Sequence, residues 1–296
     1  MSMSLAVPGQ KNLTLRNKTF VPRKAESASD SNMRDVHRYI VLAISIALML
    51  SGAACNKANS PQQSFSANNT SAAEDIANAD QFYAQRADLM QLRRGIVSLR
   101  QALTKDPGNY DAAWKLSKFN YYLAIHTDNS NESDQAFKDG ISAGKTAVQL
   151  QNEKPDGHFW LGANYGGAAK HSTIQGLATV NDIRSEMETV LRLDQGYQDG
   201  SAYMVLGLVY LNAPGIVGGD PKKAVQEMED GLRFGEPNAF LHLHLAEAYK
   251  KVGRNDDARR ELKKILSMTP DPNYQPEYKE ASSAAQKLLD QIDHAD

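Results

Sequence analysis

The stretch YLNAPGIVGGDPKKA, residues 210–224, combines glycines, prolines and two lysines in an order that could serve a phosphate. A phosphate loop needs Gly-x-x-x-x-Gly-Lys-Ser/Thr between a strand and a helix, so that backbone N–H groups and the lysine surround the anion. Here no strand pattern precedes the glycines, and no Lys-Ser/Thr follows them directly. Asp220 and Pro221 instead match a helix start, with Asp as N-cap and Pro in the first position. We therefore interpret the stretch as a connection between two helices.

The histidines and carboxylates do not have the spacing of a catalytic or metal site. His242 and His244 are two residues apart, so a helix points them to different sides. Asp182 and Glu186 are four apart, but Arg184 between them is typical of a solvated helix face. We predict neither a nucleophile elbow nor a His-Glu-x-x-His zinc motif. The protein is therefore predicted not to be an enzyme and to carry no metal or cofactor.

The segment GHFWLGANYGGAAKH, residues 157–171, mixes aromatic residues and histidines with glycines, and Gly162, Gly166 and Gly167 lie inside a helical pattern. Each glycine weakens a helix by up to about 1 kcal/mol, so something must offset the loss. Close contact with a neighbouring helix is the simplest explanation. The alternative is a ligand-lining helix, in which missing side chains leave a cavity that aromatic rings enclose. On that alternative the candidate ligand-binding residues are His158, Trp160, Tyr165 and His171.

The one cysteine, Cys55, lies at the end of a segment that has the organisation of an export signal. Arg34 and Arg38 precede the apolar run Tyr39–Leu50, which is shorter than the roughly 20 residues of a membrane-spanning helix. Small residues then lead to Cys55, as in a bacterial lipoprotein signal, although Gly52 stands where such signals usually carry Leu. The resemblance implies a diacylated Cys55 at the mature N-terminus. An uncleaved anchor and a buried cysteine are the alternatives.

This interpretation divides the chain into four parts, and translation starts at either Met1 or Met33. The polar tether rich in Ser, Asn and Gln lets the folded domain stand away from the bilayer. We expect a lipid-anchored protein of the cell envelope that faces the periplasm. The parts are an upstream extension or disordered segment (1–32), the signal peptide (33–54), the lipidated cysteine with its tether (55–75) and the helical domain (76–296).

The charge of the mature chain argues against nucleic acid as a partner. Of the 33 Lys/Arg and 35 Asp/Glu residues, seven basic and three acidic ones precede residue 56, which leaves a net charge of −6 for the rest. Nucleic-acid binding needs clustered basic residues that neutralise phosphates. The mature protein is too acidic overall to favour that function.

Helical patterns follow one another from about Ala73, with turn residues every 15 to 20 positions and no strand signals. The last repeat carries tetratricopeptide (TPR) marks at the expected 34-residue spacing, and only Ile265 departs from the pattern. Similar marks recur upstream. We predict an all-α solenoid of about five degenerate TPR-like helix hairpins, with Glu277–Ile292 as a capping helix. The marks of the last repeat are His242, Leu245, Ala246, Tyr249, Ala258, Leu262 and Pro270.

The predicted repeats differ in the distance between their aromatic and small-residue marks. The last repeat takes nine residues from Tyr249 to Ala258, whereas the three before it take 14, 18 and about 20. Equivalent insertions lie on one edge of a solenoid, because each repeat is one unit stacked on the next. The extra residues of the three longer repeats are therefore predicted to gather on one rim.

Three segments, HFWLGANYGG, VNDIRSEMETVLRLD and the long run from Gly200 to Tyr249, resemble the T-component (TatT-like) family linked to tripartite ATP-independent periplasmic (TRAP) transporters. The similarity spans roughly Asp75 to the C-terminus. Its most specific marks are Ile183-Arg184, Met187-Glu188, Leu193-Asp194, Pro214-Gly215 and Gly218-Gly219-Asp220. The resemblance implies a periplasmic lipoprotein, trimeric, that docks a periplasmic solute-binding protein and encloses a pore or cavity for an apolar ligand.

On this hypothesis the connection between the two helices takes part in docking. The candidate partner-binding residues are Gly176, Pro214, Gly215, Ile216, Val217, Gly218 and Gly219. A general scaffold lipoprotein for envelope assembly or secretion, which holds peptides in a concave groove, is the main alternative. A lipid-anchored enzyme is a third, without a supporting motif.

Overall fold

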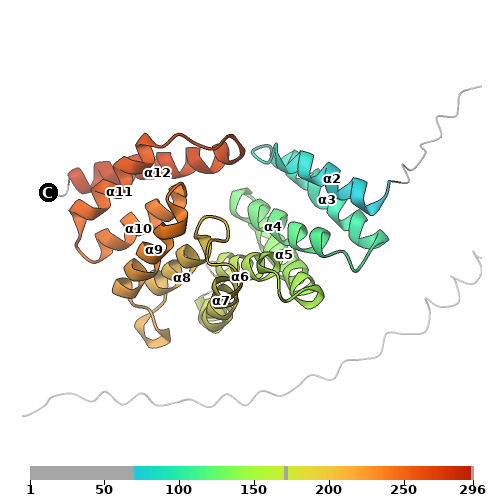
Figure 1. Cartoon of the computed structure of the whole chain (residues 1–296), viewed down its shortest axis with the longest axis horizontal. Coiled ribbons are helices and arrows are strands. Elements are labelled where there is room, and N and C mark those ends of the chain that lie inside the picture. The colour runs from blue at the N-terminus through green and yellow to red at the C-terminus, as the bar shows by residue number, and fades with distance from the viewer. Residues whose placement is uncertain (1–69, 170–172, 295–296) are drawn as a thin grey trace, which may run out of the picture. The chain divides into compact units, whose positions relative to one another are not determined.

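The computed structural model describes residues 70–169 and 173–294, and every regular element in those ranges is a helix (Figure 1). Five antiparallel hairpins follow one another and a last helix closes the series, as the repeat pattern predicted. The hairpins are α2 (Ala72–Tyr83) with α3 (Leu89–Lys105), α4 (Tyr110–His126) with α5 (Ser130–Leu150), α6 (Pro155–Ala169) with α7 (Thr173–Leu193), α8 (Ser201–Asn212) with α9 (Pro221–Gly235) and α10 (Ala239–Lys251) with α11 (Asn255–Ser267). The last helix is α12 (Gln275–Asp293), and short 3-10 turns, η1 (Gly215–Val217) and η2 (Pro272–Tyr274), precede α9 and α12.

Side-chain caps define where most of these helices begin. The carboxamides of Asn109, Asn129 and Asn238 each accept a hydrogen bond from the backbone N–H three residues later, at 3.0 to 3.1 Å. Ser71 forms a reciprocal capping box with Glu74 at the start of α2. Such caps satisfy backbone N–H groups that lack partners within the helix, which stabilises each start by about 1 kcal/mol. The turn residues that punctuate the sequence thus mark the helix boundaries.

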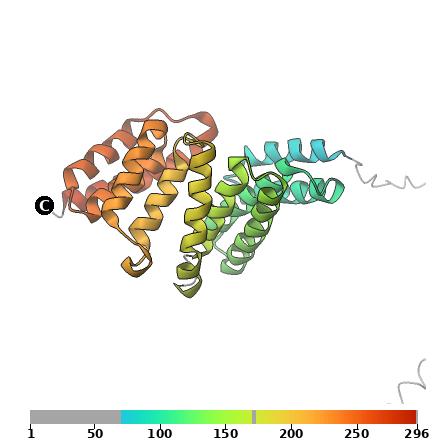
Figure 2. The ribbon, with the colours of Figure 1, turned by 60° about the horizontal axis from the view of Figure 1, so that its bottom comes forward.

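The hairpins stack in one direction, so the helices form two layers (Figure 2). The first helices α2, α4, α6, α8, α10 and α12 contact one another in series, and each second helix packs between them. Ala246 and Ala258 are fully buried and let α10 approach α11, while Tyr249 and Leu262 fill the groove beside them. These four TPR marks are therefore buried where α10 and α11 meet.

The extra residues of the longer repeats mainly extend helices. α5 and α7 have 21 residues each, against 13 for α10 and 13 for α11. Within the described hairpins, the connection between α8 and α9 carries a 3-10 turn of its own. A spacing between sequence marks cannot separate a longer helix from a longer loop, and the gathering of the extra residues on one rim stays a prediction.

The capping helix α12 packs on α10 and α11, as expected, and its start also reaches the other end of the stack. Figure 1 shows the turn between α2 and α3 beside the start of α12. Arg86 in that turn is bound to Glu277. Among the described residues, no helix combines the length and the apolar character needed to cross a bilayer. Met1, Met33, the signal segment and Cys55 lie outside the described residues, so their predicted roles remain predictions.

Candidate functional site

The connection between α8 and α9, residues 213–220, is a compact loop held by its own backbone. Val217 N–H donates to Pro214 O at 3.0 Å, and Gly219 N–H donates to the same oxygen at 3.1 Å. Asp220 N–H donates to Tyr210 O at 2.8 Å, which joins the end of the loop to α8. Gly218 has φ 87°, a left-handed conformation that glycine adopts without strain. Asp220 then caps α9, as predicted.

Arg184 of α7 holds the 213–220 loop from the preceding hairpin. Its guanidinium donates to Val217 O and Gly218 O, each at 3.1 Å, and lies 4.9 Å from the centre of the Tyr210 ring. Lys223 places its ammonium 4.2 Å from the same ring, and its hydrogen bond with Tyr210 raises its pKa. Arg184 Nε is buried and has no hydrogen-bond partner among the described residues. The loop therefore has a fixed shape and a basic margin.

Ile216 is the exposed apolar tip of this loop. Its relative accessibility is 93%, while Val217 beside it is half-buried. The candidate residues Pro214, Gly215, Gly218 and Gly219 form the turn that presents Ile216. Gly176, the remaining partner-binding candidate, lies in α7. Partner binding by these residues stays a prediction.

His158 of α6 lies in a buried ion pair rather than on an open wall. Its Nδ1 is 2.6 Å from Glu186 Oε2, and its Nε2 donates to Asn152 O at 2.9 Å. The hydrogen bond with Glu186 raises the pKa of His158. His242 of α10 repeats the arrangement with Glu261 and with the carbonyl of Glu236. Both ring nitrogens of His158 are therefore hydrogen-bonded within the fold, in the same arrangement as those of His242.

Trp160 packs towards α4, whereas His158 is bound to Glu186 of α7. The Trp160 ring centre is 5.7 Å from that of Tyr121 on α4 and 5.0 Å from that of Phe159. Its Nε1 is buried and has no hydrogen-bond partner among the described residues. Tyr165 is half-buried, with the Lys145 ammonium 5.9 Å from its ring centre. His171 lies outside the described residues, so ligand binding by the four candidates stays a prediction.

The glycines of α6 have different surroundings. A Cβ at Gly167 would lie 2.2 Å from the Phe137 ring, and one at Gly162 would lie 2.4 Å from Met187 Cε. A Cβ at Gly166 would meet its nearest neighbour, Ile183 Cδ1, only at 4.0 Å. Close helix contact therefore explains Gly162 and Gly167, and it is the simpler of the two interpretations of this segment.

The letters Gly-x-Ser-x-Gly of a nucleophile elbow do occur in the sequence, at Gly140–Gly144. They lie in the middle of α5, where no strand-to-helix elbow exists to expose a nucleophilic Ser142. Both glycines serve packing instead, because a Cβ at Gly140 would collide with Asn164 and one at Gly144 with Leu161. Within residues 70–169 and 173–294, no group of His, Cys, Asp and Glu is arranged to hold a metal ion.

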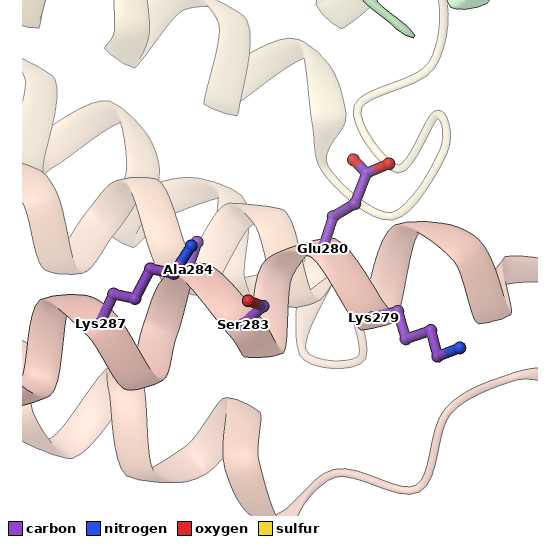
Figure 3. Close-up of a pocket in the computed structure, with 5 residues that line it drawn as sticks. All are labelled: Lys279, Glu280, Ser283, Ala284 and Lys287. Atoms are coloured by element: carbon purple, nitrogen blue, oxygen red, sulfur yellow. The ribbon is translucent and has the colours of Figure 1, made fainter.

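Two clefts adjoin the start of α12, and neither could be predicted from the sequence. The first, of about 360 Å³, lies between the α2–α3 turn, the end of α4 and α12, with Arg86, Tyr122, His126 and Glu280 among its lining residues. His126 Nε2 is 2.7 Å from Glu280 Oε1 there. The second is a shallow surface depression, and Figure 3 shows its lining residues Lys279, Glu280, Ser283, Ala284 and Lys287, which all belong to α12. The first depends on contacts between repeats that are distant in the sequence.

Residues 122–294, more than half of the chain, match the profile of the family described as TRAP transporter T-component. The chain belongs to the TRAP transporter T-component family. No curated protein matches the sequence. The resemblance found in the sequence is therefore confirmed, and the family links this T-component to TRAP transporters.

Several solved structures are similar to this T-component. TTC0263, a thermophilic TPR protein of Thermus thermophilus, has 19% identity and a TM-score of 0.56, over 73% of this chain and 100% of that one. PilW, a type IV pilus biogenesis factor, has 16% identity and a TM-score of 0.49, over 75% and 91%. PilF of Pseudomonas aeruginosa has 16% identity and a TM-score of 0.48, over 75% and 93%. The first similarity supports the fold, and identities this low carry nothing about function.

Proposed function

We propose that this T-component is a periplasm-facing, lipid-anchored accessory protein that docks a solute-binding protein of a TRAP transporter. The family and the TPR-like scaffold support a role in protein association. The observation that carries docking is the exposed Ile216 on the 213–220 loop, which Arg184 holds in place. The protein contributes binding and no catalytic step.

The loop suits docking because little order remains to be gained on binding. Ordering a flexible loop on association lowers affinity, and a loop fixed beforehand avoids most of that loss. Its backbone hydrogen bonds and the Arg184 contacts fix it in the free protein. An isoleucine that is 93% exposed on a rigid turn can enter an apolar pocket without rearrangement.

The basic residues around Ile216 indicate which charge the partner's surface should carry. Arg184 forms no ion pair with a described residue, and Lys222 and Lys223 are exposed in the first turn of α9. Basic groups at the margin of an interface favour a partner with acidic groups, mainly through faster association. We propose that the partner offers a small apolar pocket surrounded by carboxylates.

The docking proposal is tested by photo-crosslinking from position 216 in cells, followed by mass spectrometry. We expect the crosslinked product to contain a periplasmic solute-binding protein. Ile216→Asp should remove the co-purification of that protein, since a carboxylate would meet an acidic surface. Met90→Asp is the matched control, because Met90 is also exposed, at 60%, but lies on α3. Unchanged co-purification with Ile216→Asp overturns docking by this loop, and peptide products alone would favour the general scaffold.

The anchor is a separate part of the proposal and has its own test. We propose that Cys55 carries the lipid and that the residues between Cys55 and the capping box at Ser71 form the tether, which is shorter than the predicted 55–75 because α2 begins at Ala72. Labelling cells with an alkyne analogue of palmitate should mark the wild-type protein and leave Cys55→Ser unmarked. Labelling of Cys55→Ser would contradict the assignment of this cysteine. Native mass spectrometry of the same samples would show whether the protein is the trimer that the resemblance implies.

A further inference from the structure

Lys118, on the first-layer helix α4, is a lysine that lies among aromatic rings without an anion. Its ammonium is 4.2 Å from the centre of the Tyr83 ring and 5.7 Å from that of Trp160. It forms no ion pair or hydrogen bond with a described residue. Lys115, one turn earlier on the same helix, is by contrast paired with Asp80 at 2.6 Å. A half-buried charge without a partner is unfavourable in a folded protein.

The electrostatic surroundings of Lys118 increase this disadvantage. Burial, and to a lesser extent the nearby positive charge of Arg86, lower its pKa to about 8. Glu277 and Asp80 act in the opposite direction, but their carboxylates are bound to Arg86 and Lys115. An additional negative charge near the Lys118 ammonium would therefore stabilise its charged form.

A second unmet donor lies close to Lys118. Trp160 Nε1 is buried without a hydrogen-bond partner among the described residues. Buried donors without a partner are rare in native proteins, and each one calls for an explanation such as an absent ligand. The ring of Tyr121 stands 5.7 Å from that of Trp160, which adds an apolar wall. Three first helices, α2, α4 and α6, thus bring a cation, a neutral donor and aromatic faces to one place.

We propose that Lys118 and Trp160 bind the carboxylate of a small organic acid, whose apolar body packs against Tyr83 and Tyr121. The proposal goes beyond the docking role proposed above and does not depend on it. A carboxylate would accept a charge-assisted hydrogen bond from Lys118 and a second bond from the indole N–H. Lys118, Tyr83 and Tyr121 are partly exposed, so the ammonium and the two rings border solvent. Trp160 Nε1 is buried, so on this proposal the side chains around it move aside as the carboxylate enters.

The experiment titrates the whole chain with phenylacetate and with the uncharged phenylacetamide, followed by the two tryptophan indole N–H signals in NMR. The chain has two tryptophans, and Trp114 serves as an internal control because its Nε1 donates to Asp111 at 3.2 Å. We expect phenylacetate to shift the Trp160 signal downfield and leave that of Trp114 in place. The amide should bind about tenfold more weakly or worse, the effect of losing a charge-assisted hydrogen bond.

Substitutions then test the donor. Lys118→Met keeps the length of the side chain and should remove the response to phenylacetate, whereas Lys115→Met should keep it. Equal responses to the acid and the amide, an unchanged affinity in Lys118→Met, or no shift at millimolar phenylacetate would each overturn the site. None of these results bears on crosslinking from position 216, so failure of this site and failure of docking are distinguishable.

Discussion

Arg86 and Glu277 are 191 positions apart in the chain and form a bidentate ion pair. Arg86 Nε donates to Glu277 Oε1 at 2.7 Å, and a terminal nitrogen donates to Oε2 at 2.6 Å. The Arg86 side chain is only 5% exposed and lies against the Tyr83 ring. The guanidinium also donates to the carbonyl of Asn273. This set of bonds, which we call the closing contact, joins the first hairpin to the last helix.

Removing Arg86 should destabilise the protein strongly. Arg86→Gln leaves the Glu277 carboxylate near the α2–α3 turn without its partner, and breaking a buried ion pair typically costs about 3 kcal/mol. We expect a loss of that size in the free energy of unfolding, measured by urea denaturation. The lost contact also frees the first hairpin, so its amides should exchange hydrogen faster than those of α10.

Arg93→Gln is the matched control for the closing contact. Arg93 also forms a bidentate pair, with Glu132, but its side chain is 44% exposed. Exposed pairs contribute at most about 1 kcal/mol because water screens them. Similar losses in the two variants would show that the closing contact contributes no more than a surface pair.

The helices and their pairing could be predicted from the sequence because their causes are local. Small residues such as Ala246 and Ala258 recur at fixed spacing wherever two helices must approach, and caps such as Asn238 mark each start. The closing contact could not be predicted. It depends on the curvature of five stacked hairpins. The residues next to Arg86 and Glu277 in the sequence contain no motif that indicates a partner so distant in the chain.

The candidate site was predictable only in part, for a related reason. Ile216 could be identified because an apolar residue in a Gly/Pro-rich connection is conspicuous, and the structure leaves it exposed. His158 was also conspicuous, but its bonds with Glu186 and Asn152 depend on packing against α7. Lys118 was missed because a single lysine in a helical pattern gives no sign that it lacks an anion.

The neighbouring glycines of α6 should respond in opposite ways to the same change. Gly167→Ala would place a methyl group 2.2 Å from the Phe137 ring and should destabilise the protein by about 1 to 3 kcal/mol. At Gly166 there is room for a methyl group. Gly166→Ala should therefore stabilise the protein by about 0.5 to 1 kcal/mol, because alanine favours the helix. Thermal unfolding of the two variants measures both effects. Stabilisation by both substitutions would contradict the close contact at Gly167.

The ion pair of His158 and Glu186 should make stability depend on pH. Glu186 raises the pKa of His158 above its ordinary value of 6.5, so the fold favours the protonated ring. The contribution is therefore present below about pH 6.5 and is lost as pH rises through the raised pKa. At high pH the neutral ring donates through Nε2 to Asn152 O, which leaves Nδ1 as an acceptor facing a carboxylate.

Glu186→Gln tests this dependence directly. It should cost about 1 to 2 kcal/mol of unfolding free energy at pH 6 and much less at pH 9, measured by urea denaturation at both values. Arg93→Gln serves again as the reference, because its effect should be nearly the same at both pH values. A loss from Glu186→Gln that does not change between pH 6 and pH 9 would mean that protonation of His158 does not contribute.

Lys118→Met should make the unliganded protein more stable. Burial lowers the pKa of Lys118 from 10.5 to about 8. The charged form of the side chain therefore destabilises the folded state relative to the unfolded state. This destabilisation is complete below about pH 8 and disappears as the pH rises towards 10.5. The His158 pair, by contrast, stabilises the fold at low pH. We expect a gain of about 1 to 3 kcal/mol at pH 7, and a smaller one at pH 10, in urea denaturation. Lys115→Met should instead be neutral or destabilising, because it removes the pair with Asp80. A loss of stability in Lys118→Met at pH 7 would show that the lysine already has a favourable environment, and the proposed carboxylate site would lose its physical reason.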